Sequence, residues 1–207
     1  MGRNTLIIIG AALFCSGLAG PTGLITIPIA DILRHREMSF THAIVGTEPR
    51  FDKRYIHAGG IQAGVFDRVE FGFDTDYEGD FTFNAKALLY ETPESGRFAL
   101  SAGVQAFQDR KGDPYVVARM DFASFRLHGG WLRDTRHRMI VGVDFPICGD
   151  YVGIAEHTTG RDGSTWFGVA GPLFGVPGLS FSVGIGMPHA KADPIQHTAT
   201  ISYGLRF

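Results

Sequence analysis

The sequence has few cysteines, no long apolar run and no excess of charge of one sign. It contains two cysteines in 207 residues, and loss of the N-terminal stretch that holds Cys15 would leave Cys148 alone, which excludes an internal disulfide. No segment approaches 18 uninterrupted apolar residues, so no transmembrane helix is expected. The 19 basic and 21 acidic side chains are interspersed, which argues against a nucleic-acid partner.

Glycine and phenylalanine, in contrast, are abundant. The chain holds 28 glycines and 17 phenylalanines, and its apolar stretches are short, which favours strands joined by tight turns. The mean hydropathy is +0.05, which suits neither a bundle of membrane helices nor a typical soluble domain. Strands with one apolar and one polar face would give this average.

The first 19 residues have the pattern of a secretory signal peptide. Arg3 supplies the charged start, residues 6–14 the apolar run and residues 17–19 a small-residue cleavage site after Ala19. Phe14 is bulky where a lipoprotein signal needs a small residue before Cys15. We therefore expect an exported protein whose mature chain starts at residue 20.

Strict alternation dominates the chain from residue 38 onward. Between Leu179 and Met187, every second residue is large and apolar, and serines and glycines lie between. A period of two places the two sets on opposite faces of a strand. The pattern predicts twelve strands, at about 38–46, 55–64, 68–77, 81–91, 96–107, 113–122, 125–132, 138–147, 151–160, 164–173, 178–188 and 195–207.

An even number of strands of this length predicts an all-β fold, a transmembrane antiparallel up-and-down β-barrel formed by residues 38–207. Residues 20–33 are too apolar for a free tail, and the segment 20–37 is expected to pack at the rim or as a plug in the lumen. A thirteenth strand is the alternative, but it would break the even strand number. A soluble β-sandwich or lipocalin-like barrel would also alternate. The polar face is rich in Gly, Ser and Thr rather than in Lys and Glu, which favours the membrane barrel.

The alternation also predicts which polar side chains point into the lumen. Two interpretations are open: paired charges that fill the lumen, or a polar path for a small solute or glycan. Glu156 is a further candidate for this set. The predicted lumen residues are Glu70, Asp74, Asn84, Lys86, Arg119, Asp121, Arg126, His128, Arg138 and Asp144.

The last strand and the aromatic residues carry further signals. A terminal strand with apolar residues at alternate positions and an aromatic end resembles the signal read by the barrel-assembly machinery, and here it comprises Ile201, Tyr203, Leu205 and Phe207. Aromatic residues near strand ends suit interfacial girdles. This set is Tyr55, Tyr77, Tyr90, Tyr115, Trp131, Tyr151, Trp166 and Tyr203.

No catalytic motif emerges from the sequence. It contains neither G-x-S-x-G nor H-E-x-x-H, so no catalytic residue, metal site or cofactor is expected. The histidines at 42, 57, 157 and 197 have no evident serine or acid partner, which argues against a phospholipase barrel.

Residues 20–33 resemble the start of mature YjbH-like outer-membrane proteins, a family linked to exopolysaccharide production. The matching positions of its G-L-I-x-x-P-x-A-acidic pattern are Gly23, Leu24, Ile25, Pro28, Ala30 and Asp31, and Ile29 stands where the family has a small or hydroxyl residue. The hairpin at 64–73 and the last seven residues also look like that family. The resemblance implies a short member in the outer membrane of a Gram-negative bacterium.

We therefore expect first a non-enzymatic barrel accessory to cell-envelope or exopolysaccharide biology. The alternatives are a narrow, porin-like diffusion channel and, after it, a lipid-active enzyme. The expected partners are outer-membrane lipids and lipopolysaccharide, the barrel-assembly machinery and a polysaccharide or small solute.

Overall fold

The computed structural model describes residues 23–47, 55–93, 97–109, 111–191 and 193–207. The predicted signal peptide at 1–19 lies outside these residues. The described chain forms twelve strands, which confirms the predicted number with small shifts at the ends. They are β1 (Glu37–Gly46), β2 (Ile56–Val65), β3 (Val69–Thr75), β4 (Phe81–Glu91), β5 (Phe98–Gln108), β6 (Lys111–Asp121), β7 (Arg126–Arg133), β8 (His137–Cys148), β9 (Tyr151–Thr158), β10 (Ser164–Pro172), β11 (Leu179–Pro188) and β12 (Gln196–Arg206).

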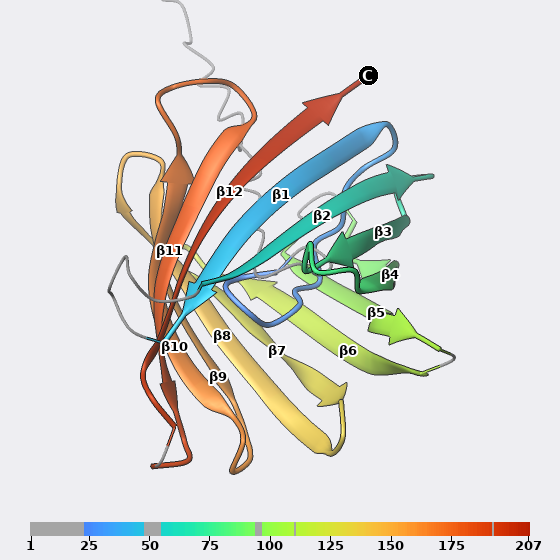
Figure 1. Ribbon diagram of the computed structural model, residues 1–207. Helices are drawn as coiled ribbons and strands as arrows, with labels where there is room; N and C mark the ends of the chain where they lie inside the picture. Colours follow the sequence, from blue (N-terminus) through green and yellow to red (C-terminus); the bar gives the residue numbers. More distant parts are fainter. Residues whose placement is uncertain (1–22, 48–54, 94–96, 110, 192) are drawn as a thin grey trace, which may run out of the picture.

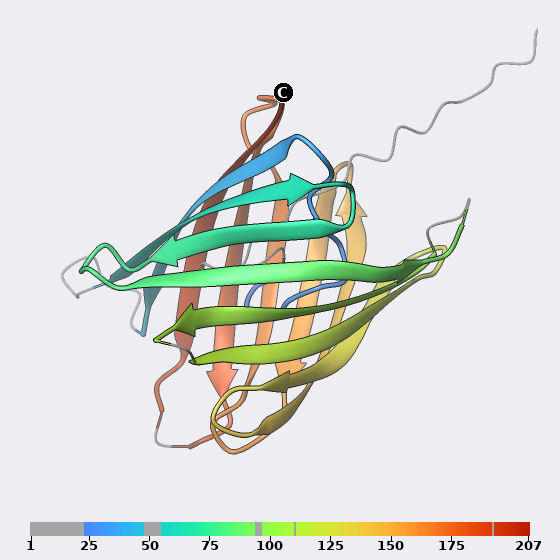
Figure 2. The ribbon, with the colours of Figure 1, turned by 90° about the vertical axis from the view of Figure 1, so that its right-hand side faces the viewer.

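The strands close into a barrel in which each strand pairs antiparallel with its neighbours in sequence (Figures 1 and 2). The last strand, β12, closes the ring on β1, with Phe40 opposite Tyr203 and Glu37 opposite Arg206. The predicted antiparallel up-and-down barrel is therefore confirmed. Among the described residues, no helix is long and apolar enough to cross a membrane.

The two faces of each strand differ as the alternation predicts. In β3, Phe71 and Phe73 are exposed on the outside, whereas Glu70 and Asp74 are buried inside. In β11, Ile185 is 53% exposed and the neighbouring Gly184 faces the lumen. Large apolar side chains thus cover the outer surface, the arrangement that a surrounding hydrocarbon layer requires and that a soluble barrel reverses.

Residues 23–33 fill part of the lumen, and we call them the plug. They run through the ring of strands before β1 begins (Figure 1). The plug begins with a tight turn, in which the Leu24 N–H donates to the Ile27 carbonyl at 3.1 Å. A single β-bridge in this segment joins Gly23 to Pro28. The segment is therefore a plug rather than a thirteenth strand.

The next three residues fasten the plug to the rim. The Arg34 guanidinium lies 3.0 Å from the Glu91 carboxylate at the end of β4. The His35 N–H donates to the Asp67 carboxylate at 2.8 Å, and Asp67 belongs to the tight β2–β3 turn. The Phe207 N–H donates to the Arg36 carbonyl at 3.1 Å. The structure thus shows lumen packing for 23–33 and rim contacts for 34–36.

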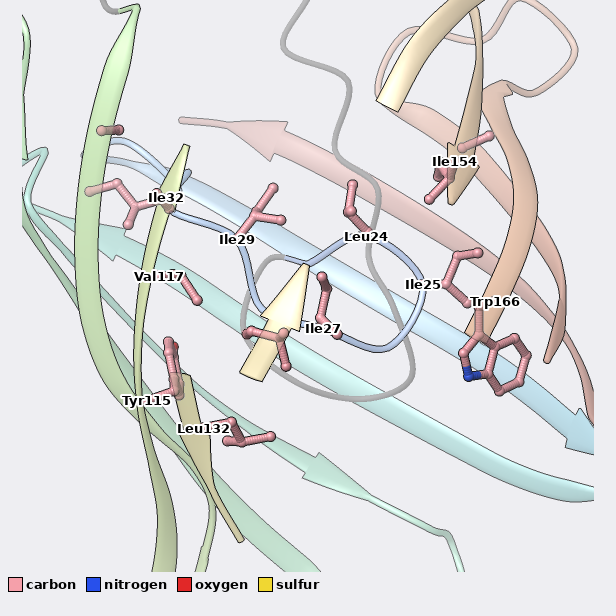
Figure 3. Packing of buried hydrophobic residues seen from close by; sticks show 14 of the residues in the cluster. Leu24, Ile25, Ile27, Ile29, Ile32, Tyr115, Val117, Leu132, Ile154 and Trp166 are labelled. Carbon is pink, nitrogen blue, oxygen red and sulfur yellow. The ribbon is translucent and has the colours of Figure 1, made fainter. Parts of the chain in front are cut away.

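An apolar cluster joins the plug to one side of the barrel wall (Figure 3). Leu24, Ile25 and Ile27 belong to this cluster together with inward side chains of the strands, among them Tyr115 and Trp166, which are 1% and 3% exposed. The girdle prediction is therefore wrong for Tyr115 and Trp166. Both residues occupy inward-facing positions in the period-two alternation of their strands. The apolar cluster that includes the plug gives these large rings a packing surface inside the barrel.

Candidate functional site

The lumen is the candidate functional site. Glu156 on β9 binds the plug through several hydrogen bonds. The buried Glu156 carboxylate accepts hydrogen bonds from the Ile25 N–H at 2.9 Å and the Thr26 N–H at 2.7 Å. The Thr26 hydroxyl donates to the same carboxylate. A carboxylate aimed at the two N–H groups of one turn is a charge-assisted clamp on the backbone. Glu156, which the sequence analysis gives as a further candidate for the lumen set, therefore binds the plug.

A second group of inward side chains holds the other half of the plug. Glu70 on β3 accepts from the Leu33 N–H at 2.8 Å and lies 3.6 Å from the Lys86 ammonium on β4. The Lys86 ammonium donates to the Ile29 carbonyl at 3.3 Å, and the Ser101 hydroxyl donates to the Ala30 carbonyl at 2.7 Å. The barrel therefore supplies partners for backbone groups that are shielded from water.

Asp31, the only charged residue of the plug, meets a cluster of charges on β6, β7 and β8. Its carboxylate forms ion pairs with Arg119 and with Arg126, the latter at 3.5 Å. Each arginine also forms an ion pair through its Nε with an acid of the barrel wall. Asp121 lies 2.9 Å from Arg119, and Asp144 lies 2.8 Å from Arg126.

His128 extends this cluster on the other side of Asp144. Its Nε2 lies 2.8 Å from an Asp144 carboxylate oxygen, and the ring is 1% exposed. Five of the predicted lumen residues therefore come together at one place: Arg119, Asp121, Arg126, His128 and Asp144.

The remaining predicted lumen residues lie apart from the plug contacts. The Asn84 amide donates to the buried Asp74 carboxylate, and the Asn84 oxygen accepts from the Ala106 N–H at 3.0 Å. Arg138 pairs with Asp134, which follows β7, at 2.6 Å. Paired charges in the lumen are one of the two interpretations of the sequence. Glu70 pairs with Lys86 and Asp144 pairs with Arg126 in this way, each across two neighbouring strands.

The list of predicted lumen residues leaves out a wall of small hydroxyl side chains opposite the charged wall, although the sequence places Ser and Thr on the polar faces of the strands. These residues are buried on β1, β11 and β12 and carry no charge: Ser39, Ser182, Thr198, Thr200 and Ser202. The alternation within 179–187 already places serines on the inward face, so the signal was present. Sequence reasoning also missed Ser101 and Asp31 as contact residues, because only the folded chain brings them to their partners.

A hollow of about 210 Å³ lies beside the charged cluster, at the barrel end that contains the β6–β7 and β8–β9 turns. Phe122, Phe125, Arg126, Asp144 and Pro146 are among its lining residues. The Arg126 and Asp31 side chains are 29% and 27% exposed. The charged cluster can therefore be reached from this mouth of the lumen.

The strand histidines on the outside form two small polar groups. His42 Nδ1 lies 3.2 Å from the Tyr77 hydroxyl, and the Thr165 hydroxyl lies between His157 Nδ1 at 2.9 Å and His189 Nε2 at 3.2 Å. Across the described residues, no three His, Cys, Asp or Glu side chains gather as a metal site needs.

The predicted assembly residues lie on the outer face of β12. Ile201, Tyr203 and Phe207 are 50%, 44% and 67% exposed, and Leu205 is half-buried. In the closed barrel, β12 pairs with β11 on one side and with β1 on the other, so its edges are free only before closure.

The barrel is similar in fold to solved porin structures. A KdgM porin in complex with disordered oligogalacturonate aligns with a TM-score of 0.56 at 10% identity, over 83% of this chain and 99% of that one. A second KdgM porin structure gives 0.53 at 10% identity, over 81% and 98%. No family model and no curated protein matches the chain. The likeness shows a shared porin fold.

Proposed function

We propose that the protein is a narrow diffusion channel for small polar solutes in the outer membrane of a Gram-negative bacterium, with a lumen that the plug closes. The observation that carries the proposal is the closed twelve-stranded barrel, with exposed apolar side chains outside and buried polar side chains along its inner walls, in which residues 23–33 fill part of the lumen. The fold of the KdgM porin supports it.

The two walls of the lumen suggest how a solute passes. The charged wall binds the plug through Glu156, Glu70, Lys86 and the two arginines, whereas the opposite wall carries small hydroxyl side chains. Short hydroxyl side chains offer hydrogen bonds without filling the lumen, so a solute would move along β1, β11 and β12. For the passage to become wide, residues 23–33 must move away from their position in the lumen.

The other two expectations have less support. An exopolysaccharide role follows from the resemblance of residues 20–33, and residues 23–33 of that stretch form the plug in this chain. A lipid-active enzyme would need a serine and an acid beside a histidine, whereas His42 and His157 lie next to Tyr77 and Thr165 hydroxyls. We therefore propose a non-enzymatic channel.

Planar-bilayer recording of the mature chain, refolded in detergent, tests the proposal. The wild type is expected to be mostly closed, and Glu156→Ala to open more often, because it removes the acceptor of three hydrogen bonds to the plug. Glu78→Ala, in the exposed β3–β4 turn, is the matched control and should behave as wild type. Absence of conductance in all three proteins would refute a channel.

A further inference from the structure

Arg119 and Arg126, which we call the arginine pair, present the same atom to the same carboxylate. Each uses Nε for a barrel acid, Asp121 or Asp144, at 2.9 or 2.8 Å. Each then points Nη1 at Asp31 of the plug. The barrel acids thus lie on the Nε side of both guanidinium groups, and a guanidinium has donors enough for two carboxylates. The geometry is that of a clamp built for a carboxylate.

The barrel does not need Asp31 to balance these charges. Asp121 and Asp144 already supply one acid for each arginine, and the adjacent His128 is bound to Asp144. Asp31 comes from the plug, which is joined to the wall mainly through backbone groups and apolar packing. The Asp31 carboxylate is therefore a third acid at the arginine pair. It comes from another part of the chain, and the two arginines are already balanced by Asp121 and Asp144.

The Arg126 side of the clamp lies where a solute can reach it, whereas the Arg119 side chain is 10% exposed and lies deeper. The hollow of about 210 Å³ at the barrel mouth is lined by Arg126 and Asp144, and the Asp31 side chain is 27% exposed. A small organic anion in this hollow would be next to Arg126. A carboxylate fits two converging guanidinium groups because each of its oxygens can pair with one Nη1, as the two Asp31 oxygens do.

We propose that the arginine pair is a binding site for small carboxylate solutes and that Asp31 occupies it as an internal mimic of the solute. The inference rests on the proposed channel function and names its solute class. A carboxylate that enters from the mouth replaces Asp31 at the two Nη1 atoms. The plug then loses its ion pairs and is held by apolar packing and by its contacts with Glu156, Glu70, Lys86 and Ser101.

Gluconate and sorbitol are a matched pair of probes, since they have the same carbon skeleton and differ by one carboxylate. Calorimetric titration of the refolded, full mature chain in detergent measures binding. Asp31→Asn keeps the shape of the plug and removes its charge, so it should bind gluconate at least fivefold more tightly than wild type does. Sorbitol binding should stay weak in both. The double variant Asp31→Asn with Arg126→Gln should lose the gain.

Liposome swelling with the same two solutes measures passage. Asp31→Asn should raise the ratio of gluconate entry to sorbitol entry severalfold, and Arg133→Gln, an exposed residue at the far end of β7, should leave it unchanged. Equal gluconate binding in wild type and Asp31→Asn, or a gain that survives Arg126→Gln, overturns the carboxylate site. Tighter binding without swelling by either solute keeps the site and refutes the channel.

Discussion

At the residue scale, inward charged side chains act chiefly as partners for a segment that has no partner strand. Glu156 and Glu70 accept from backbone N–H groups, while Lys86 and Ser101 donate to carbonyls. A buried backbone group without a partner costs free energy comparable with a lost hydrogen bond. Long charged side chains can reach the middle of the lumen, where strand backbones cannot.

Charge reversal at Lys86 tests this role. The Lys86 ammonium is fully buried between the Glu70 carboxylate and the Ile29 carbonyl. Lys86→Glu would place two acids together in the lumen, and we expect a loss of about 3–5 kcal/mol, the usual cost of breaking a buried pair. The urea midpoint of the barrel refolded into lipid vesicles, read by heat-modifiable gel migration, measures it.

Lys111→Glu is the control for this reversal, because Lys111 is exposed at the start of β6. Surface substitutions of this kind usually change the free energy of unfolding by less than about 0.5 kcal/mol. Equal midpoints for the two variants would contradict the structural role of Lys86.

At the scale of the element, composition explains why residues 23–33 form a plug instead of a strand. The segment is apolar at consecutive positions, Leu24 and Ile25 among them, whereas the barrel strands alternate apolar and polar side chains to match their two faces. Pro28 lacks a backbone donor and weakens any ladder. The barrel also has no open edge, since β1 and β12 pair with each other.

Glycines in the barrel wall make room for the plug, and Gly142 on β8 offers a direct test. A Cβ at Gly142 would lie 2.4 Å from a Leu24 methyl carbon and 2.9 Å from one of Ile27. Gly142→Val should therefore displace the plug at a cost of about 1–3 kcal/mol, the range for overpacked cores. Hydrogen exchange of residues 24–33, followed by mass spectrometry, should be faster in the variant.

Gly129→Val on the adjacent strand β7 is the matched control. A Cβ there meets only the Ile140 carbonyl oxygen, at 4.0 Å. Exchange in the plug should remain at the wild-type rate, and an acceleration equal to that of Gly142→Val would show that the effect is not local.

At the scale of the whole molecule, closure of β12 on β1 completes the barrel. The ten residue pairs from Glu37 with Arg206 to Gly46 with His197 join the two ends of the barrel chain. Such a non-local pairing forms late, because loop-closure entropy opposes it. Before closure, the free edge of β12 is available for pairing with an insertase.

Phe207→Ala should accordingly slow insertion of the barrel severalfold in vesicles that contain the assembly machinery, and should change the stability of the folded barrel little. Phe207 is 67% exposed at the end of β12. The time course of heat-modifiable gel migration measures insertion. Phe174→Ala removes another exposed aromatic, in the β10–β11 turn, and should insert at the wild-type rate; a delay of equal size there would argue against a specific terminal signal.

Much of this molecule is determined by the sequence alone. Period-two alternation sets which side chains of a strand share a face, so the twelve strands, their antiparallel order and the inward position of residues such as Glu70 and Lys86 could be predicted. The apolar outer face of β3 and β11 follows from the same local rule.

Only the tertiary structure decided what the inward residues contact. Asp31 and Arg119 are 88 positions apart, and Ile25 and Glu156 are 131 apart, so no local pattern links them. Alternation likewise could not tell that Tyr115 and Trp166 face an apolar plug instead of lipid. Strand periodicity is a property of the backbone, whereas the contents of the lumen depend on which distant segments the closed barrel encloses.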